Sequence, residues 1–274
     1  MGGLPAASAA GRGRGMAGGA TGHAARADAD RLRESGMLVL RALVFDAVLY
    51  GLMGVMGLAV APVAAVSRRA ARWGIRLYCR IVLAALAAIC GLRVEIRGEV
   101  PQGRALVVAK HQSFLDVLAL TATLPEPRFV MKAELLRMPV FGWYARRLGC
   151  IPIVRERGPM ALRGLLAEVG ATGIEGQLVI YPEGTRVAPG QKLRYRPGAA
   201  ALYGRFKLRA VPVATNAGLF WPRRSLRRRP GRAVIAFLDP ISPGLPAERF
   251  MAEIETRIET ACAALLPAGM AAGR

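Results

Sequence analysis

From residue 37 to residue 66 the sequence is almost continuously apolar, and only Arg41 and Asp46 carry charge. The part from 47 to 66 has no charged side chain and is as long as a helix that crosses a bilayer, about 20 residues. Such a helix must be buried in lipid or against protein, because its apolar surface is unfavourable in water. The sequence therefore predicts an N-terminal apolar helical membrane anchor, which we place at residues 37–92.

The apolar run is followed by a group of arginines: Arg68, Arg69, Arg72, Arg76 and Arg80. Four of them recur at every fourth position and would form a stripe along one side of a helix. A second apolar run, 81–92, is too short to span a membrane by itself. The pattern fits a spanning helix followed by an interfacial helix, or a helical hairpin embedded in one leaflet, while a buried hairpin of a soluble protein is the alternative. Membrane attachment is the favoured interpretation, and the arginines predict the cytoplasmic face of the cell inner membrane.

After residue 92 the pattern changes to short apolar runs that alternate with helical stretches, which is typical of an α/β domain with a mostly buried sheet flanked by helices. The predicted strands are 92–97, 105–109, 128–131, 150–154, 177–181, 210–214 and 233–238. The predicted helices are 114–123, 139–147, 160–172, 198–205 and 246–266. We therefore predict a single α/β domain at 93–266, after a disordered tail at 1–36 and the anchor at 37–92, and before a C-terminal tail at 267–274.

The last predicted helix, 246–266, is amphipathic. Its apolar face carries Phe250, Ile254, Ile258, Cys262 and Leu265. Its glutamates are expected mostly on the other faces: Glu248, Glu253, Glu255 and Glu259. This helix should therefore cover one side of the sheet.

The net charge of +21 accompanies a sequence that is 53% apolar. On a folded protein, such a charge suggests nucleic acid, an anionic membrane surface, or an acidic small molecule or carrier protein as partner. Nucleic acid is not expected, because only 6% of residues are aromatic and no helix-turn-helix or RNP pattern appears. A dense run of arginine at 222–232 fits a solvated loop, a contact with anionic lipid, or the docking of an acidic carrier protein. A membrane-tethered basic binding module remains an alternative class of function.

His111 is the candidate catalytic imidazole, because the other histidine, His23, lies in the predicted tail. It follows the predicted strand 105–109 and precedes a helix, where α/β sheets gather ligands. If Asp116 lies in the first helical turn, its carboxylate can reach back to the ring and orient it, as in acyl-transfer triads. Ser113 and Asp116 also have the spacing of a helix capping box, which needs no chemistry, and both interpretations can hold at once.

A second group of polar residues follows the predicted strand 177–181, in Tyr181-Pro-Glu-Gly-Thr-Arg186. Proline and glycine favour a turn there, which would present a carboxylate, a hydroxyl and a guanidinium. Glutamate can bind a hydroxyl group, whereas threonine and arginine can bind a phosphate. An ordinary turn with an ion pair would have a similar sequence.

Taken together, four segments in this order resemble the sequence blocks of the glycerolipid acyltransferase family. They are His111-Gln-Ser-x-x-Asp116, Gly149-Cys-Ile-Pro-Ile-Val-Arg155, Tyr181-Pro-Glu-Gly-Thr-Arg186 and Val211-Pro-Val-Ala-Thr-Asn216. The resemblance covers roughly residues 90–240 and is greatest to the bacterial 1-acyl-sn-glycerol-3-phosphate acyltransferases. The sequence departs from the family at Lys110, where many members have asparagine.

The resemblance implies transfer of a fatty acyl group from an acyl thioester, on acyl carrier protein or coenzyme A, to the sn-2 hydroxyl of 1-acyl-sn-glycerol-3-phosphate. The product would be phosphatidate for phospholipid synthesis. His111 would take the hydroxyl proton and Asp116 would orient the ring. The residues implied in acceptor binding are Arg155, Glu183, Gly184, Thr185 and Arg186, with Lys132 as a further candidate. We expect no metal and no cofactor beyond the thioester co-substrate, and the alternative acceptor is another lysolipid such as lyso-ornithine lipid.

Overall fold

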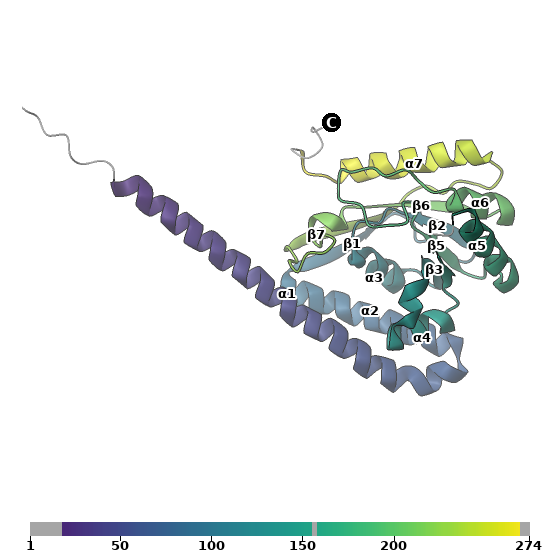
Figure 1. The fold of residues 1–274 in the computed structure, drawn as a ribbon, viewed down its shortest axis with the longest axis horizontal. Helices are drawn as coiled ribbons and strands as arrows, with labels where there is room; N and C mark the ends of the chain where they lie inside the picture. The colour runs from purple at the N-terminus through teal and green to yellow at the C-terminus, as the bar shows by residue number, and fades with distance from the viewer. Residues whose placement is uncertain (1–17, 155–157, 269–274) are drawn as a thin grey trace, which may run out of the picture.

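The computed structural model describes residues 18–154 and 158–268, with side chains from residue 35 onward. Its centre is one seven-stranded sheet in the order β1-β7-β6-β2-β5-β3-β4 (Figure 1). Neighbouring strands are parallel except β6 and β7, which run antiparallel. The strands are β1 (Leu92–Arg97), β2 (Ala105–Ala109), β3 (Pro127–Lys132), β4 (Ile151–Ile153), β5 (Gln177–Ile180), β6 (Ala210–Thr215) and β7 (Gly231–Phe237).

Seven α-helices and two short 3₁₀ helices surround this sheet in the described part of the chain. The α-helices are α1 (Gly18–Val66), α2 (Arg68–Cys90), α3 (Phe114–Thr123), α4 (Pro139–Arg147), α5 (Pro159–Thr172), α6 (Gly198–Phe206) and α7 (Ala247–Ala264). The 3₁₀ helices are η1 (Ala133–Arg137) and η3 (Ala217–Leu219). Every strand and helix predicted within 93–266 is present, with ends shifted by at most two residues, so the α/β class is confirmed.

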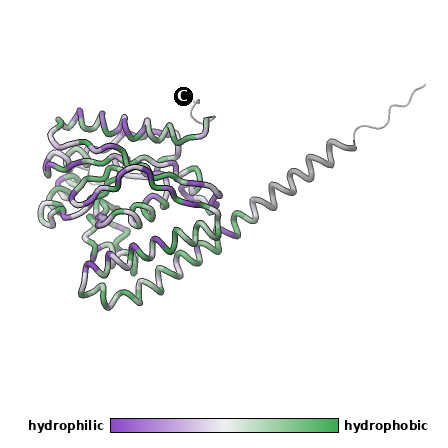
Figure 2. Tube along the Cα trace, turned by 180° about the vertical axis from the view of Figure 1, so that it is seen from behind, coloured by the Kyte–Doolittle hydropathy of each residue, from purple (hydrophilic) through white to green (hydrophobic). Residues whose placement is uncertain are grey.

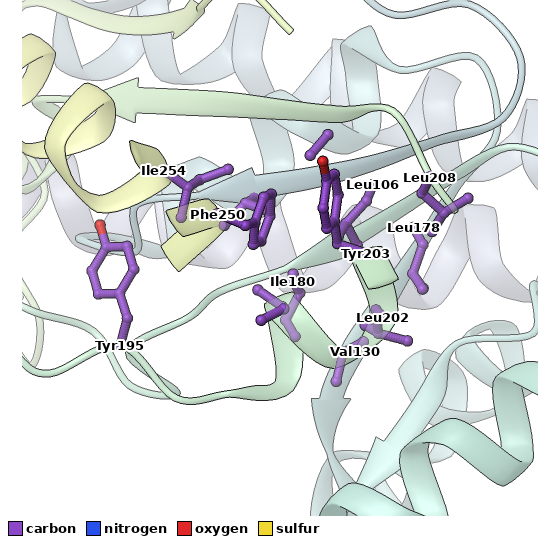
Figure 3. Packing of buried hydrophobic residues seen from close by; sticks show 14 of the residues in the cluster. Leu106, Val130, Leu178, Ile180, Tyr195, Leu202, Tyr203, Leu208, Phe250 and Ile254 are labelled. Atoms are coloured by element: carbon purple, nitrogen blue, oxygen red, sulfur yellow. The ribbon is translucent and has the colours of Figure 1, made fainter. Parts of the chain in front are cut away.

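The central strands are buried on both faces, and their side chains alternate between two cores. On β2, Leu106 and Val108 point into a core shared with α5, α6 and α7. Figure 3 shows Phe250 and Ile254 of α7 packed there beside Tyr203 of α6. The intervening residues of β2 contact α3 on the other face. Alternating burial in both directions explains why these strands are continuous apolar runs.

A third core joins α1 and α2 to the domain. Phe45 and Leu49 of α1 are buried with Leu86 of α2, Leu115 of α3 and Trp221. The two helices form an antiparallel hairpin that turns at residue 67 (Figure 1). The hairpin therefore packs against the same side of the sheet as α3.

Much of this hairpin is apolar (Figure 2), and many of its apolar side chains are nevertheless exposed. Residues Ser35–Val66 and Arg68–Cys90 are each long and apolar enough to cross a membrane. Only 11% and 28%, respectively, of their most apolar windows is buried in the protein. The exposed apolar side chains of α1 include Leu40, Leu43, Val44, Tyr50, Val55 and Leu58. A soluble core helix would bury this surface, so the hairpin has the exposed apolar side that the anchor hypothesis requires.

Two expectations about the N-terminal region differ from the structure or lie outside it. A disordered tail was expected over 1–36, whereas α1 already begins at Gly18. The stretch from 18 to 36 is rich in alanine, the strongest helix former, which favours extension of an existing helix. Residues 1–17 and 269–274 lie outside the described residues, so the outer parts of both predicted tails stay predictions.

The arginine stripe of α2 faces the protein in part. Arg72 forms a salt bridge of 2.8 Å with Glu126, and Arg76 donates to the carbonyl of Pro125 at 3.5 Å. These contacts join α2 to the loop between α3 and β3. The stripe thus helps to dock the hairpin on the domain.

Candidate active site

Three parallel neighbours, β6, β2 and β5, end at the same edge of the sheet. Thr215 is the last residue of β6, while His111 and the turn 181–186 follow β2 and β5. Parallel strands bring the residues after their carboxyl ends together even when they are far apart in sequence. The first, third and fourth sequence blocks therefore meet at one edge.

His111 and Asp116 form the centre of this site. The Nδ1 atom of His111 lies 3.2 Å from Oδ2 of Asp116. The same carboxylate oxygen accepts hydrogen bonds from the backbone N–H groups of Gln112 and Ser113, at 2.7 and 2.8 Å. Ser113 caps α3 and completes a capping box with Asp116. The capping interpretation is therefore confirmed, and the same buried carboxylate contacts the imidazole as the orienting interpretation requires.

Two further side chains support this pair, and the sequence did not assign either of them a role. The Tyr181 ring stacks on the His111 ring, with centroids 4.0 Å apart and planes inclined by 20°. Thr215 donates its hydroxyl to Oδ1 of Asp116 at 3.3 Å and accepts from the backbone N–H of Ala217. Both residues lie in blocks that resemble the family, but only the packed structure shows what they touch. Together they fix the ring plane and the carboxylate.

Behind the site lies a buried ionic network centred on Lys110. Its Nζ atom lies 2.6 Å from Oε1 of Glu259 on α7 and 3.2 Å from Oε1 of Glu183. It also donates to the Gln191 carbonyl at 3.2 Å, while Tyr195 donates its hydroxyl to Glu259 at 2.9 Å. The lysine is 1% exposed and Glu183 is 3% exposed. One ammonium group thus joins β2, the turn 181–186 and α7.

Glu183 is less well satisfied than its partners. Its contact with Lys110 is an ion pair rather than an aligned hydrogen bond, and within the described residues neither carboxylate oxygen meets hydrogen-bond geometry. Burial raises the pKa of Glu183 to about 7, although the Lys110 ammonium opposes the shift, and Glu259 adds to it. Burial also acts to lower the pKa of Lys110, but the two carboxylates outweigh it and raise that pKa. The network therefore carries one more carboxyl group than it has cations.

This geometry bears on the role that the resemblance implies for Glu183. Its side chain points into the protein toward Lys110, and no part of it reaches solvent in the described structure. Glu183 contacts the lysine rather than an open surface. In this arrangement the carboxylate links the turn 181–186 to the lysine, and its part in acceptor binding stays a prediction.

The rest of the turn places Arg186 at the site. Gly184 adopts a φ of 68°, and a Cβ atom there would lie 3.0 Å from Nε of Arg196, so this position favours glycine. The backbone N–H of Val187 donates to the carbonyl of His111 at 2.8 Å, which joins the turn to the first block. Partial burial lowers the pKa of Arg186, and the nearby charges of Arg223 and Arg224 lower it further. Arg186 therefore lies in a positive environment that favours an anion.

The remaining predicted residues are less closely associated with the site. Lys132 ends β3 at the same edge of the sheet, but it is about half exposed and pairs with Glu134 at 3.1 Å. Arg155 lies outside the described residues, and its part in the site stays a prediction. Thr185 is partly buried within the turn. The structure thus brings together His111, Asp116, Glu183 and Arg186, with Lys132 at the neighbouring strand.

This site and fold agree with the relationships of the sequence. The acyltransferase family model matches residues 91–216, and the chain belongs to that family of enzymes. The 1-acyl-sn-glycerol-3-phosphate acyltransferase of Pseudomonas aeruginosa is 32% identical over 195 residues, which cover 69% of this chain and 74% of the relative. The family resemblance of the four blocks is thereby confirmed.

Two further relatives are informative. The lyso-ornithine lipid O-acyltransferase of Rhodobacter capsulatus is 36% identical over 143 residues, which cover 50% of this chain and 49% of the relative. The crystal structure of the 1-acyl-sn-glycerophosphate acyltransferase PlsC from Thermotoga maritima shares the fold, with a TM-score of 0.71 and 20% identity. The match covers 83% of this chain and 95% of that structure, so the likeness includes elements beyond the family model.

Proposed function

We propose that this protein transfers a fatty acyl group from an acyl thioester to the sn-2 hydroxyl of 1-acyl-sn-glycerol-3-phosphate, giving phosphatidate for phospholipid synthesis. The observation that carries the proposal is the His111–Asp116 pair beside the basic turn that ends in Arg186. The relative from Pseudomonas aeruginosa, which bears the corresponding name, supports the same acceptor.

The role of His111 as a base depends on which of its ring nitrogens carries the proton. Asp116 accepts a hydrogen bond from Nδ1, which keeps the proton there and leaves Nε2 as the base. Nε2 takes the proton of the acceptor hydroxyl while the hydroxyl oxygen attacks the thioester carbonyl carbon. The carbon–sulfur bond then breaks, and the departing thiolate takes the proton back from the imidazolium. Asp116 stabilises the imidazolium in between, so no covalent acyl-enzyme is needed.

Arg186 is the proposed ligand of the acceptor phosphate, because its guanidinium matches a phosphate in shape and charge. Arg155 and Thr185 are proposed to complete that subsite, with Gly184 allowing the turn, and Lys132 is a candidate at its periphery. Glu183 is proposed to act through this turn by holding it against Lys110. The donor is proposed to be acyl carrier protein or coenzyme A, both of which present the acyl group as a thioester.

We also propose that the protein is attached to the cytoplasmic face of the inner membrane through α1 and α2. The exposed apolar side chains of α1 support attachment. The positive charge of the chain, +21, supports a cytoplasmic location, where anionic lipids and an excess of basic residues are expected.

The test uses the full-length protein purified in mild detergent, with 1-acyl-sn-glycerol-3-phosphate and either acyl-coenzyme A or acyl carrier protein thioester. Mass spectrometry should detect phosphatidate, and His111→Ala should lower the rate by about 10²–10⁴-fold, the usual contribution of a general base. A matched control is Thr121→Val, which removes a hydroxyl that donates to the carbonyl of Val117 within α3, the helix that follows the histidine. Full turnover by His111→Ala would refute the mechanism.

The acceptor is tested separately with lyso-ornithine lipid, because the relative from Rhodobacter capsulatus is named a lyso-ornithine lipid O-acyltransferase. Lysophosphatidate and lyso-ornithine lipid of the same acyl chain should be offered in the same detergent micelles. We expect a clear preference for the phosphate-bearing acceptor. Turnover of lyso-ornithine lipid alone would refute the acceptor and leave acyl transfer by His111 intact.

A further inference from the structure

Residues 222–229 connect η3 to β7 and hold five arginines and no acidic residue; we call this segment the arginine loop. Four of its arginines are exposed: Arg223, Arg224, Arg227 and Arg229. Leu226 at its centre is also 58% exposed. Among the salt bridges of the described residues, only that of Arg228 involves this loop. The outward charges are therefore not neutralised within the described part of the protein.

The fifth arginine holds the loop against α1. Arg228 is 5% exposed, and its Nη2 atom donates to Oδ1 of Asp46 at 2.6 Å. Its guanidinium lies over the Trp221 ring, 4.5 Å from the centroid. This contact explains why the apolar run of α1 contains an aspartate. It also fixes the arginine loop beside an exposed apolar part of α1.

The apolar surface of α1 continues on both sides of this attachment. Leu43, Val44 and Tyr50 flank Asp46 in sequence and are 50%, 47% and 60% exposed. Exposed arginines beside exposed apolar side chains are typical of a surface at the membrane interface, where guanidinium groups contact phosphates and apolar groups enter the lipid. An acidic protein would complement the charge but would leave the apolar part of the surface uncovered.

The other side of the loop reaches the active site. Arg223 donates through Nη1 to the backbone carbonyl of Arg186 at 3.4 Å. The arginine loop thus lies between the anchor helix and the turn proposed to bind the acceptor. A loop resting on the bilayer would hold that turn at the level of the lipid headgroups.

We infer that the arginine loop is a binding surface for anionic phospholipids and forms, with α1, one continuous contact with the bilayer. The inference rests on the proposed membrane attachment and adds a lipid class to it. Each arginine near an anionic surface contributes about a fivefold gain in affinity, so three of them contribute roughly a hundredfold. The gain should weaken with salt, because exposed charges are screened.

The experiment measures flotation of the full-length protein with vesicles, at a detergent concentration below micelle formation. The vesicles contain phosphatidylcholine alone or with 30% phosphatidylglycerol, which is about a third of the lipid. The test variant is Arg223→Ala/Arg224→Ala/Arg227→Ala. The matched control is Arg205→Ala/Arg209→Ala/Arg249→Ala, which removes the same charge from exposed positions on α6, before β6 and on α7, across the sheet from α1 (Figure 1).

We expect the wild type and the control to prefer the anionic vesicles, and the test variant to lose most of that preference while still binding through α1 and α2. Leu226→Ser should weaken binding to both kinds of vesicle. Equal losses in the control, or no preference in the wild type, would overturn the inference. An unchanged lipid preference with a raised KM for acyl carrier protein thioester would instead assign the loop to that protein. Absence of acyl transfer by the wild type would refute the proposed function without affecting the vesicle result.

Discussion

Replacing Lys110 by methionine should be among the most destabilising single changes in this protein. Methionine keeps most of the side-chain volume but removes the ammonium that lies 2.6 Å from Glu259 and 3.2 Å from Glu183. Two buried carboxyl groups would then face each other without a cation. Removing one partner of a buried ion pair costs about 3–5 kcal/mol, because the remaining charge stays desolvated and uncompensated.

The cost can be expressed as a melting temperature. At about 2–4 °C for each kcal/mol in a chain of this size, Lys110→Met should lower Tm by roughly 6–20 °C. Circular dichroism in detergent measures this change in Tm. All variants are heated at the same scan rate, because the apparent Tm of a protein that unfolds irreversibly depends on that rate. The difference in Tm between the wild type and Lys110→Met should become smaller as the pH falls, because protonation of a buried carboxyl group removes its charge.

Two variants make this prediction specific. Lys110→Met/Glu259→Gln leaves a single carboxyl group, which can take up a proton, so it should recover more than half of the lost stability. Lys132→Met removes a half-exposed lysine paired with Glu134 and should cost no more than about 1 kcal/mol. The reasoning fails if Lys110→Met costs no more than Lys132→Met, or if the double variant is no more stable than the single one.

Two smaller predictions follow from the same site. Burial raises the pKa of Glu183 to about 7, against 4.5 for an ordinary glutamate. The folded protein therefore binds the carboxyl proton of Glu183 more tightly than the unfolded chain does. The stability of the protein consequently falls as the pH rises from 4.5 to about 7. Thermal unfolding across that range should show this fall in the wild type and a flatter profile in Glu183→Gln, and equal slopes would contradict the assignment. Thr215→Val removes the hydroxyl that donates to Asp116 and should lower kcat about fivefold to tenfold with little change in KM, since a hydrogen bond of this kind contributes about 1 kcal/mol. Thr121→Val, which removes a hydroxyl that donates to the carbonyl of Val117 within α3, is the control, and an equal loss of kcat in both would contradict a positioning role for Thr215.

The sequence predicted well what depends on local pattern. Helix α3 begins at the predicted residue because Ser113 caps it, and Asp116 reaches His111 because both lie within one helical start. The buried strands were recognisable because side chains on both faces of a parallel sheet are apolar. In each case the interactions that decide the structure join residues close together in the chain.

The pairings that the sequence did not reveal join residues far apart. Lys110 and Glu259 are 149 positions apart, and Asp46 and Arg228 are 182 apart. The four glutamates of α7 were expected mostly away from its apolar face, but Glu259 is buried beside Ile258, because the lysine that follows β2 compensates its charge. The lysine at position 110, where many family members have asparagine, was the signal in the sequence that a carboxylate is needed nearby. It could not say which of four glutamates on α7 would supply it.

The Asp46–Arg228 pair also changes how the membrane hypothesis should be tested. The sequence pattern changes at residue 92, but the segments before and after it share buried contacts. Phe45 and Leu49 of α1 lie in one core with Leu115 and Trp221 of the α/β domain. Deleting the hairpin would expose that core, so insolubility of the remaining domain would say little about lipid. Substitutions confined to the exposed side, at Leu43, Val44 and Tyr50, leave the core and the ion pair in place. Loss of membrane binding in such variants, with Tm unchanged, would assign attachment to the outer surface of α1 itself.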